Sequence, residues 1–166
     1  MIGQRATLKR IGVNAALSEG VAMERRPPKP ICKLFVLCRE VFYDPVRQTY
    51  AIVSPVHQVV SPRFPIQEQL AIFARWSSAH GLYELGIELR TLEGEVIWRA
   101  TLQDPLKVTN PLHIWLVPIY RFVVNIPAPG KYEIALLANG EEVACDDLIA
   151  RFPQDHPHGT TEPPPD

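Results

Sequence analysis

The sequence predicts an all-β protein, an antiparallel sandwich of two sheets with about seven to nine strands. The first observation is a closing hairpin, in which two apolar runs flank Asn139-Gly140, the pair most favoured in a two-residue type I′ turn. The second is another hairpin around Glu93-Gly94, whose arms alternate apolar and polar residues. The third is a series of short apolar runs, separated by turn residues, in the preceding part of the chain.

The composition narrows the classes of partner. With 166 residues, 46% of them hydrophobic, and a formal net charge of −1, the chain suits one domain with a substantial core. This charge balance gives no reason to expect nucleic acid or an acidic membrane surface as a partner. No segment is apolar enough to span a membrane. There is no glycine-rich phosphate loop and no CxxC pair, so we expect no cofactor.

The three cysteines have no spacing typical of a disulfide framework. Cys32 and Cys38 are an even number of residues apart in an apolar strand, so we expect both thiols on the same side, buried and free. Free thiols favour a reducing compartment, and residues 1–23 make a poor signal peptide. A cytoplasmic location is therefore expected.

Three segments differ in their patterning. Residues 1–30 are predicted to be a disordered or mis-annotated N-terminal extension. If synthesis starts at Met23 rather than Met1, the first 22 residues are not translated. Residues 31–152 carry the apolar periodicity and form the sandwich domain. Residues 153–166 are predicted to be a disordered, proline-rich tail.

The first strands follow the proline-rich end of the extension. The run ICKLFVLC begins at Ile31 and is apolar on both faces, as expected for a strand buried in a sandwich. Shorter strands are expected near residues 48–53 and 57–60, edged by prolines. Residues 67–77 are ambiguous: propensity slightly favours a helix, whereas alternate apolar residues also fit a strand.

The middle hairpin covers residues 82–102. A two-residue turn or a four-residue loop at Glu93-Gly94 would give the same register. In that register three apolar pairs face each other: Leu89 with Trp98, Ile87 with Ala100, and Leu85 with Leu102. Beyond this hairpin, residues 112–126 are expected to form two strands divided by Pro118.

In the closing hairpin we expect two apolar cross-strand pairs, Leu136 with Val143 and Ile134 with Cys145. A β-bulge at Asp146-Asp147 would then pair Tyr132 with Leu148. Tyr132 also stands where β-sandwiches often place an anchoring tyrosine, near the penultimate strand.

Three stretches occur in a characteristic order: CKLFVLCREVFYD, then RFPIQEQLAIFARWSSAHGLYELGIELRTLEGEVIW, then VNIPAPGKYEIALLANGEEVA. In this order they resemble a family of uncharacterised bacterial proteins, a domain of unknown function, over roughly residues 31–152. The resemblance implies an immunoglobulin-like sandwich and therefore favours a strand over a helix at residues 68–76. It implies no activity and no site residues.

Residues that could carry chemistry are scattered. No two histidines have the i, i+4 spacing of a helical metal pair, and His156-x-His158 is expected to be solvated. The bulge accounts for Asp146-Asp147 better than a Ca²⁺ site or a catalytic carboxylate. We therefore assign no catalytic, cofactor-binding or metal-binding residue.

The run LHIWLV at residues 112–117 is apolar on both strand faces. A sandwich covers only one face of each sheet, so one of these faces needs another cover. His113, Trp115 and Val117 share a face and form a candidate interaction surface. Alternatively, Trp115 packs beneath the proline-rich loop at residues 54–65.

Three functional hypotheses follow. The leading one is a non-catalytic β-sandwich module that binds another macromolecule, a protein. The second is a structural subunit that self-associates through sheet edges or through the face at residues 112–117. The third is a hydrolase whose catalytic residues lie on loops near His57, His80 and Asp104.

Overall fold

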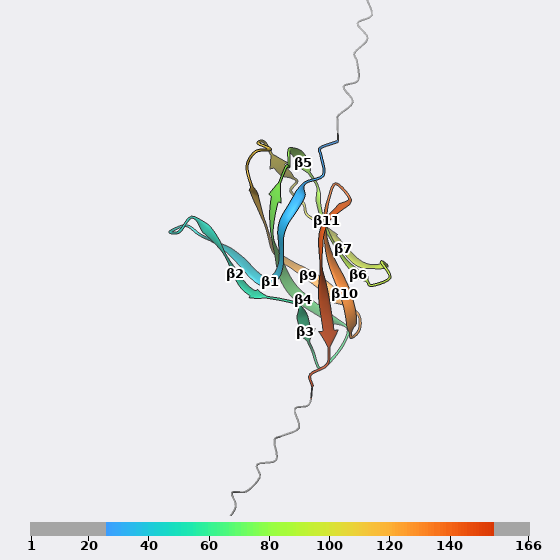
Figure 1. Ribbon diagram of the computed structural model, residues 1–166. Coiled ribbons are helices and arrows are strands. Elements are labelled where there is room, and N and C mark those ends of the chain that lie inside the picture. The colour runs from blue at the N-terminus through green and yellow to red at the C-terminus, as the bar shows by residue number, and fades with distance from the viewer. Residues whose placement is uncertain (1–25, 155–166) are drawn as a thin grey trace, which may run out of the picture.

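The computed structural model describes residues 26–154, and these form strands and turns without a helix (Figure 1). In chain order the eleven strands are β1 (Ile31–Asp44), β2 (Thr49–Pro55), β3 (Gln58–Val60), β4 (Ile66–Ser77), β5 (Gly81–Tyr83), β6 (Leu85–Thr91), β7 (Val96–Thr101), β8 (Leu106–Val108), β9 (Trp115–Ile126), β10 (Gly130–Ala138) and β11 (Glu141–Arg151). The all-β prediction is confirmed. None of the described residues belongs to a long apolar helix of the kind that crosses a membrane.

Two sheets make up most of the domain. One has four strands in the order β2-β1-β4-β9, and the other has five in the order β3-β11-β10-β6-β7. The strands β5 and β8 form a separate two-stranded sheet, so the strand count exceeds the expected seven to nine. Pairing is antiparallel except between β3 and β11, which are parallel.

The hydrophobic core lies between the four-stranded and the five-stranded sheets. Alternate side chains of β4, β6 and β10 fill it, and they include Leu70, Ile72, Trp76, Ile87, Leu89, Ile134 and Leu136. Each of these is fully buried, as the alternation in the sequence requires of strands with one face on a core.

The closing hairpin between β10 and β11 has the predicted two-residue turn. Asn139 and Gly140 have φ angles of 53° and 77°, and a type I′ turn needs positive φ at both positions. Tyr132 faces Leu148 as predicted, and its hydroxyl donates a hydrogen bond to the carbonyl of Ala128 at 2.7 Å.

The bulge in this hairpin lies beside Leu136, close to the turn, rather than at the two consecutive aspartates. Leu136 therefore faces Ala144, and the predicted pairs of Leu136 with Val143 and of Ile134 with Cys145 are wrong by one residue. Small and apolar residues on β11 fit either face, so the apolar pattern could not locate the extra residue.

The middle hairpin pairs Leu89 with Trp98, as predicted. Its loop has three residues rather than two or four: the amide of Thr91 donates to the carbonyl of Glu95 at 2.9 Å. Gly94, with a φ of 86°, completes the loop, and its amide donates to the carbonyl of Thr91 at 3.0 Å. A register shift lies farther along the strands, between Leu89 and Arg90.

The ambiguous segment is a strand, β4, as the family resemblance implied. In contrast, the expected break at Pro118 is wrong, because β9 runs continuously through it. This strand is the edge of its sheet, where a missing amide donor on the open side costs little. A register shift opposite Leu70 and Ile72 accommodates an extra residue in β9.

Cys32 and Cys38 do not share a side of β1, contrary to the prediction. The register with β4 shifts between Cys32 and Leu34, which reverses the alternation of side chains from there on. All three cysteines are free, as expected, and Cys38 is fully buried whereas Cys145 is exposed.

The end of the N-terminal extension packs against the domain. Pro30 is buried, and the Tyr83 hydroxyl donates to the carbonyl of Pro28 at 2.7 Å. Arg26 forms an ion pair with Glu141 at 3.2 Å. The predicted boundary before Ile31 therefore falls within a segment that contacts the body, while the predictions for residues 1–25 and 155–166 lie outside the described residues.

Candidate functional site

The outer side of the four-stranded sheet, turned away from the core, is apolar. Cross-strand neighbours share a face, and on this side two rows of them cross β1, β4 and β9 while a third crosses β1 and β4. The rows are Leu34–Arg75–Leu116, Val36–Phe73–Pro118 and Cys38–Ala71. Only Arg75 is charged in these rows.

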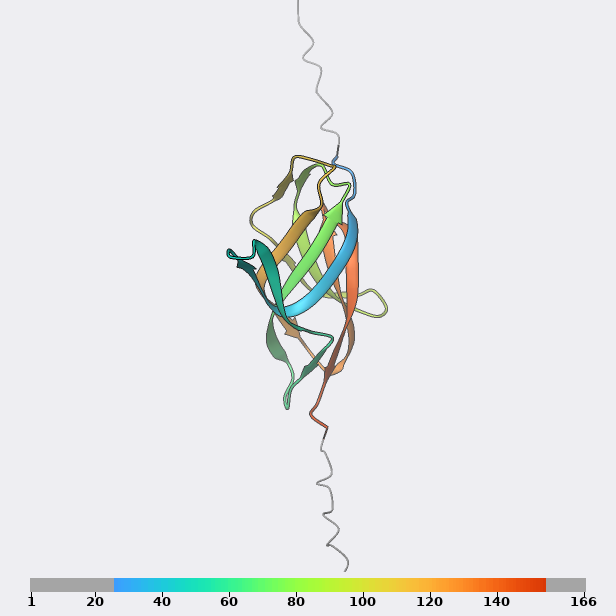
Figure 2. The same cartoon turned by 60° about the vertical axis from the view of Figure 1, so that its left-hand side comes forward.

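The hairpin of β1 and β2 extends this surface. It projects from the sandwich in Figure 1, and Figure 2 shows β1, β4 and β9 side by side with the hairpin beside them. Val41, Tyr50 and Ile52 from the hairpin pack with Cys38 and Phe73 into a second hydrophobic cluster, separate from the main core. We call this whole surface, the three rows with Val41, Tyr43, Tyr50, Ile52 and Tyr120, the outer apolar face.

Aromatic side chains are concentrated where the hairpin meets the sheet. The ring of Tyr50 lies 5.3 Å from that of Tyr43 and 5.6 Å from that of Phe73, between ring centroids. Partial burial, together with the neighbouring Tyr50, raises the pKa of the Tyr120 hydroxyl. These tyrosines have apolar rings with hydroxyls that can bond to a partner, a combination common at protein interfaces.

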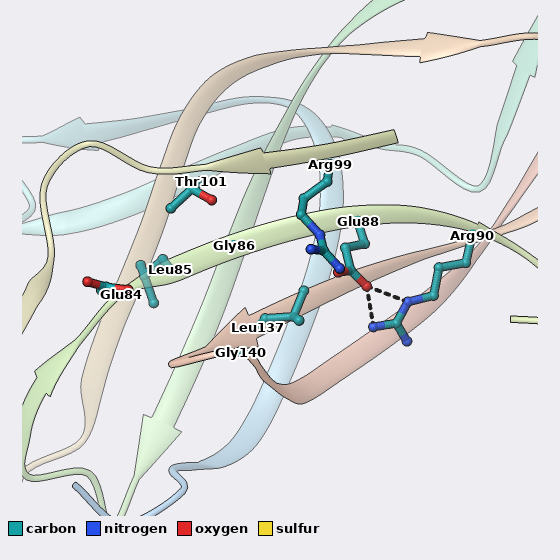
Figure 3. Close-up of a pocket in the computed structure, with 9 residues that line it drawn as sticks. All are labelled: Glu84, Leu85, Gly86, Glu88, Arg90, Arg99, Thr101, Leu137 and Gly140. Carbon is teal, nitrogen blue, oxygen red and sulfur yellow. Dashed lines mark hydrogen bonds and ion pairs between the residues drawn. The ribbon is translucent and has the colours of Figure 1, made fainter. Parts of the chain in front are cut away.

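The outer side of the five-stranded sheet has the opposite character. Glu88 on β6 is only 2% exposed although no other sheet covers it. Its carboxylate accepts a hydrogen bond from Nε of Arg90 at 2.7 Å and forms an ion pair with Arg99 across the strands (Figure 3). Arg90 in turn pairs with Glu142 on β11.

This network stabilises the charged form of its buried carboxylate. Burial raises the pKa of Glu88, but hydrogen bonds and charge interactions with Arg90 and Arg99 outweigh this effect, and the pKa lies below its ordinary value. Two arginines and two glutamates, counting Glu142, leave no net charge. The arrangement is typical of a structural network, because each charge is already neutralised by a neighbour.

A hollow of about 400 Å³ lies beside the network, where Gly86 carries no side chain. Figure 3 shows Arg90 and Arg99 directed at Glu88 rather than into open space. Cys145 lies on this side, opposite Ala135, and partial burial together with the carboxylates of Glu142 and Glu133 raises the pKa of its thiol. A raised pKa makes a thiol a poorer nucleophile at neutral pH.

A second hollow lies at the end of the sandwich where the N-terminal segment crosses β5. Arg26, Pro27, His80 and Asn139 are among its lining residues. The Arg26 guanidinium donates to the carbonyl of Asn139, so this charge too is engaged within the chain.

The structure separates the three residues of the predicted interaction surface. Val117 is buried in the core, Trp115 is half-buried against the core, and His113 is exposed in the loop before β9. The indole of Trp115 donates to the carbonyl of Asn110 at 3.0 Å, and not to the proline-rich loop. In this run the exposed apolar side chains are instead Leu112, Ile114 and Leu116.

The loop residues suggested for a hydrolase are not gathered into one site. His80 lines the second hollow, whereas His57 and Asp104 line neither hollow. Within residues 26–154 no three histidine, cysteine, aspartate or glutamate side chains lie close enough to hold a metal ion. His156 and His158 lie outside the described residues.

Sequence reasoning missed the outer apolar face. A usable signal was present, because β1 and β4 each contain consecutive apolar residues, LFVLC and LAIFA, which must place side chains on both faces.

The comparison with protein families gives a match over most of the chain. The model of a family described as "Family of unknown function (DUF6941)" matches residues 33–151. No curated protein matches the sequence.

Proposed function

Because the chain belongs to DUF6941, a family of unknown function, we propose its function from its surfaces: it is a non-catalytic interaction module that binds another protein. The observation that carries the proposal is the outer apolar face, a sheet surface that, among residues 26–154, only the β1–β2 hairpin covers in part. Apolar side chains that stay exposed together on one side of a sheet are typical of a contact site.

The chemistry of the face favours a protein over other macromolecules. Several apolar residues remain well exposed on it, among them Leu34, Leu116 and Tyr120. Nearby charges on the same strands are paired with each other, Arg121 with Glu40 at 3.0 Å and Arg39 with Glu68. Nucleic acid is usually bound by several unpaired basic groups, and the rows of this face hold only Arg75. A largely apolar segment of a protein therefore fits better.

The absence of catalysis is supported by the state of the ionisable groups. The buried carboxylate, Glu88, is neutralised, and the exposed thiol of Cys145 has a raised pKa. A catalytic acid, base or nucleophile usually has its pKa shifted toward the working pH instead.

We also propose an immunoglobulin-like arrangement of the sandwich in a bacterial, cytoplasmic protein. The bond from the Tyr132 hydroxyl to the carbonyl of Ala128 supports the first part, since a tyrosine near the penultimate strand makes a similar bond in immunoglobulin-like domains. The three free cysteines support a reducing compartment.

A photo-crosslinking experiment tests the binding proposal. A photoreactive phenylalanine analogue replaces Tyr120 on the outer apolar face in the full chain, and in a matched control it replaces Arg99 on the five-stranded sheet. Irradiation in the native host should give a discrete adduct with another protein from position 120 only. Leu116→Glu, checked by circular dichroism to be folded, should abolish that adduct. Equal labelling from both positions, or none from position 120, would contradict the proposal.

A further inference from the structure

We propose that two copies of this chain pair edge to edge through β2, with residues 49–53 of each copy antiparallel to those of the other. The inference concerns a sheet edge and a second copy. It is therefore separate from the proposed binding of another protein to the outer apolar face.

Within β2, residues 49–53 are the least protected stretch of edge in the two large sheets, whereas Ser54, with a φ of 50°, and Pro55 end the strand. The other edges have features that oppose pairing: β9 contains Pro118 and an extra residue, β7 carries the exposed Arg99, and β3 has only three residues. In contrast, residues 49–53, with the sequence TYAIV, contain no charge, proline or glycine and are rich in β-formers. Among residues 26–154 nothing pairs with the open side of β2.

A second copy is the occupant that the edge suits best. Because residues 49–53 carry no charge, they cannot attract a partner through opposite charges. For the same reason they do not repel a second copy of themselves. The hairpin projects away from the body, and the described chain starts and ends elsewhere, at the two ends of the molecule in Figure 1. We infer that a second hairpin can approach β2 at this projecting position.

Symmetry restricts the register. A two-fold axis perpendicular to a sheet keeps each residue on its own face, so one residue of β2 must lie opposite its own copy. If that residue is Ala51, all five residues pair: Tyr50 faces Ile52 and Thr49 faces Val53. A centre at Tyr50 or Ile52 leaves fewer pairs. The aromatic and β-branched pair on one face adds a favourable cross-strand contact.

Pairing in this register joins the two four-stranded sheets into one continuous sheet. Tyr50 and Ile52 already belong to the outer apolar face, so the faces of the two copies become contiguous across the two-fold axis. Apolar side chains exposed on the hairpin, such as Val53, gain cover from the second copy.

Cysteine cross-linking tests the register in the full chain. Directly opposed residues in antiparallel strands have Cα atoms about 4.5–5.5 Å apart, which lies within disulfide range. In a Cys145→Ser background, Ala51→Cys should convert most of the protein to a covalent dimer under mild oxidation. Thr49→Cys, Tyr50→Cys and the background itself should give several-fold less. Preferential cross-linking at another position, or none at Ala51→Cys, would overturn the proposal.

A charge at the same position tests the association without oxidation. Light scattering on the full chain should show a concentration-dependent dimer, and Ala51→Lys should make it monomeric by opposing two lysines at the axis. Val46→Lys, at the exposed hairpin turn, is the matched control and should still dimerise. A native chain that stays monomeric at high micromolar concentration, or a dimer that tolerates Ala51→Lys, would contradict the pairing.

The two proposals can fail separately. A monomeric chain that still cross-links another protein from position 120 would refute the pairing and leave the proposed function intact. A dimer without that adduct would do the reverse. If Ala51→Lys unfolds by circular dichroism, the cysteine series still decides the question.

Discussion

The outer sides of the two large sheets contrast in how their strands meet solvent. On the five-stranded sheet a buried carboxylate, Glu88, is neutralised by Arg90 and Arg99. On the four-stranded sheet Phe73 and Ala71 are buried by a projecting hairpin, while apolar neighbours such as Leu116 remain exposed. Both sheets cover the same core, so the two sheets differ mainly in their outer sides. We interpret the charged outer side as structural and the apolar one as suited to binding.

The outer sides of the two sheets also differ in how they accommodate a residue that is unfavourable there, a buried charge on one and an exposed apolar side chain on the other. A charge is tolerated under neighbouring side chains because ion pairs compensate its lost hydration. For the apolar side chains exposed here, residues 26–154 provide no such compensation, and burial needs another surface. We therefore place the proposed binding site on the apolar side, although the charged side has the more conspicuous residues.

The largest expected effect comes from a charge placed inside the second hydrophobic cluster. Ala71 is fully buried there, so Ala71→Asp would bury a carboxylate without a partner and should cost more than about 3 kcal/mol, or prevent folding. The control is Thr101→Asp on the exposed side of β7, near Arg99, which should change stability by less than about 0.5 kcal/mol. Urea denaturation of both variants measures the difference, and similar midpoints would remove the contrast between the two sides.

A smaller loss is expected when the buried carboxylate of the charged side is deleted. Glu88→Ala leaves Arg90 with one partner and Arg99 with none, but Arg99 is 64% exposed and stays hydrated. We expect a cost of about 2 kcal/mol, below the usual range for breaking a fully buried pair. Glu142→Ala, which removes a much more exposed partner, should cost less than about 1 kcal/mol. If the two substitutions lowered the free energy of unfolding equally, the burial of each glutamate would not determine how much it contributes to stability.

The same network predicts a dependence of stability on pH. The folded-state pKa of Glu88 is lowered, so its contribution is present above the unfolded-state pKa of about 4.3 and is lost as the pH falls through the folded value. The stability difference between the native chain and Glu88→Gln should therefore be largest near neutral pH and should shrink in acid. Urea midpoints at several pH values measure it. A difference that grows on acidification would mean that the folded-state pKa is raised instead.

Local patterns in the sequence were sufficient to predict where the two hairpins lie. Asn139 and Gly140 favour positive φ whatever surrounds them, and alternation along β6 and β7 specifies which residues face each other. The position of a bulge is less determined, because Val143 and Cys145 are compatible with either face of β11. The bulge beside Cys32 could not be located from the sequence for the same reason, and Cys32 was therefore wrongly placed on the same side of β1 as Cys38.

The candidate site depended on contacts that the sequence does not contain. The residues at 112–117 are apolar on both faces, and only the tertiary arrangement shows that Val117 faces the core while Leu116 faces outward. Glu88 follows the expected alternation for a solvent-facing residue, yet it is buried by Arg90 and by Arg99 from another strand. Cross-strand neighbours of this kind follow from register, which a single bulge changes.

The smallest expected effect tests whether the hollow beside Gly86 matters for stability. A methyl group there would meet the carbonyl of Ala100 at 3.6 Å and the side chain of Leu137 at 3.7 Å, both ordinary contacts. Gly86→Ala should therefore raise stability by about 0.4–1 kcal/mol, because it restricts the unfolded chain without strain in the folded one.

Gly81→Ala provides the contrast. Gly81 has a φ of 118°, and a methyl group would lie 2.7 Å from the side chain of Pro27, so this substitution should destabilise by about 1–3 kcal/mol. Thermal denaturation of both variants shows whether each substitution raises or lowers the stability. Destabilisation by Gly86→Ala would show that the charged side is already closely packed at Gly86 and that the hollow has no room for a methyl group. It would also strengthen the view that this side is closed, which leaves the outer apolar face as the surface open to a partner.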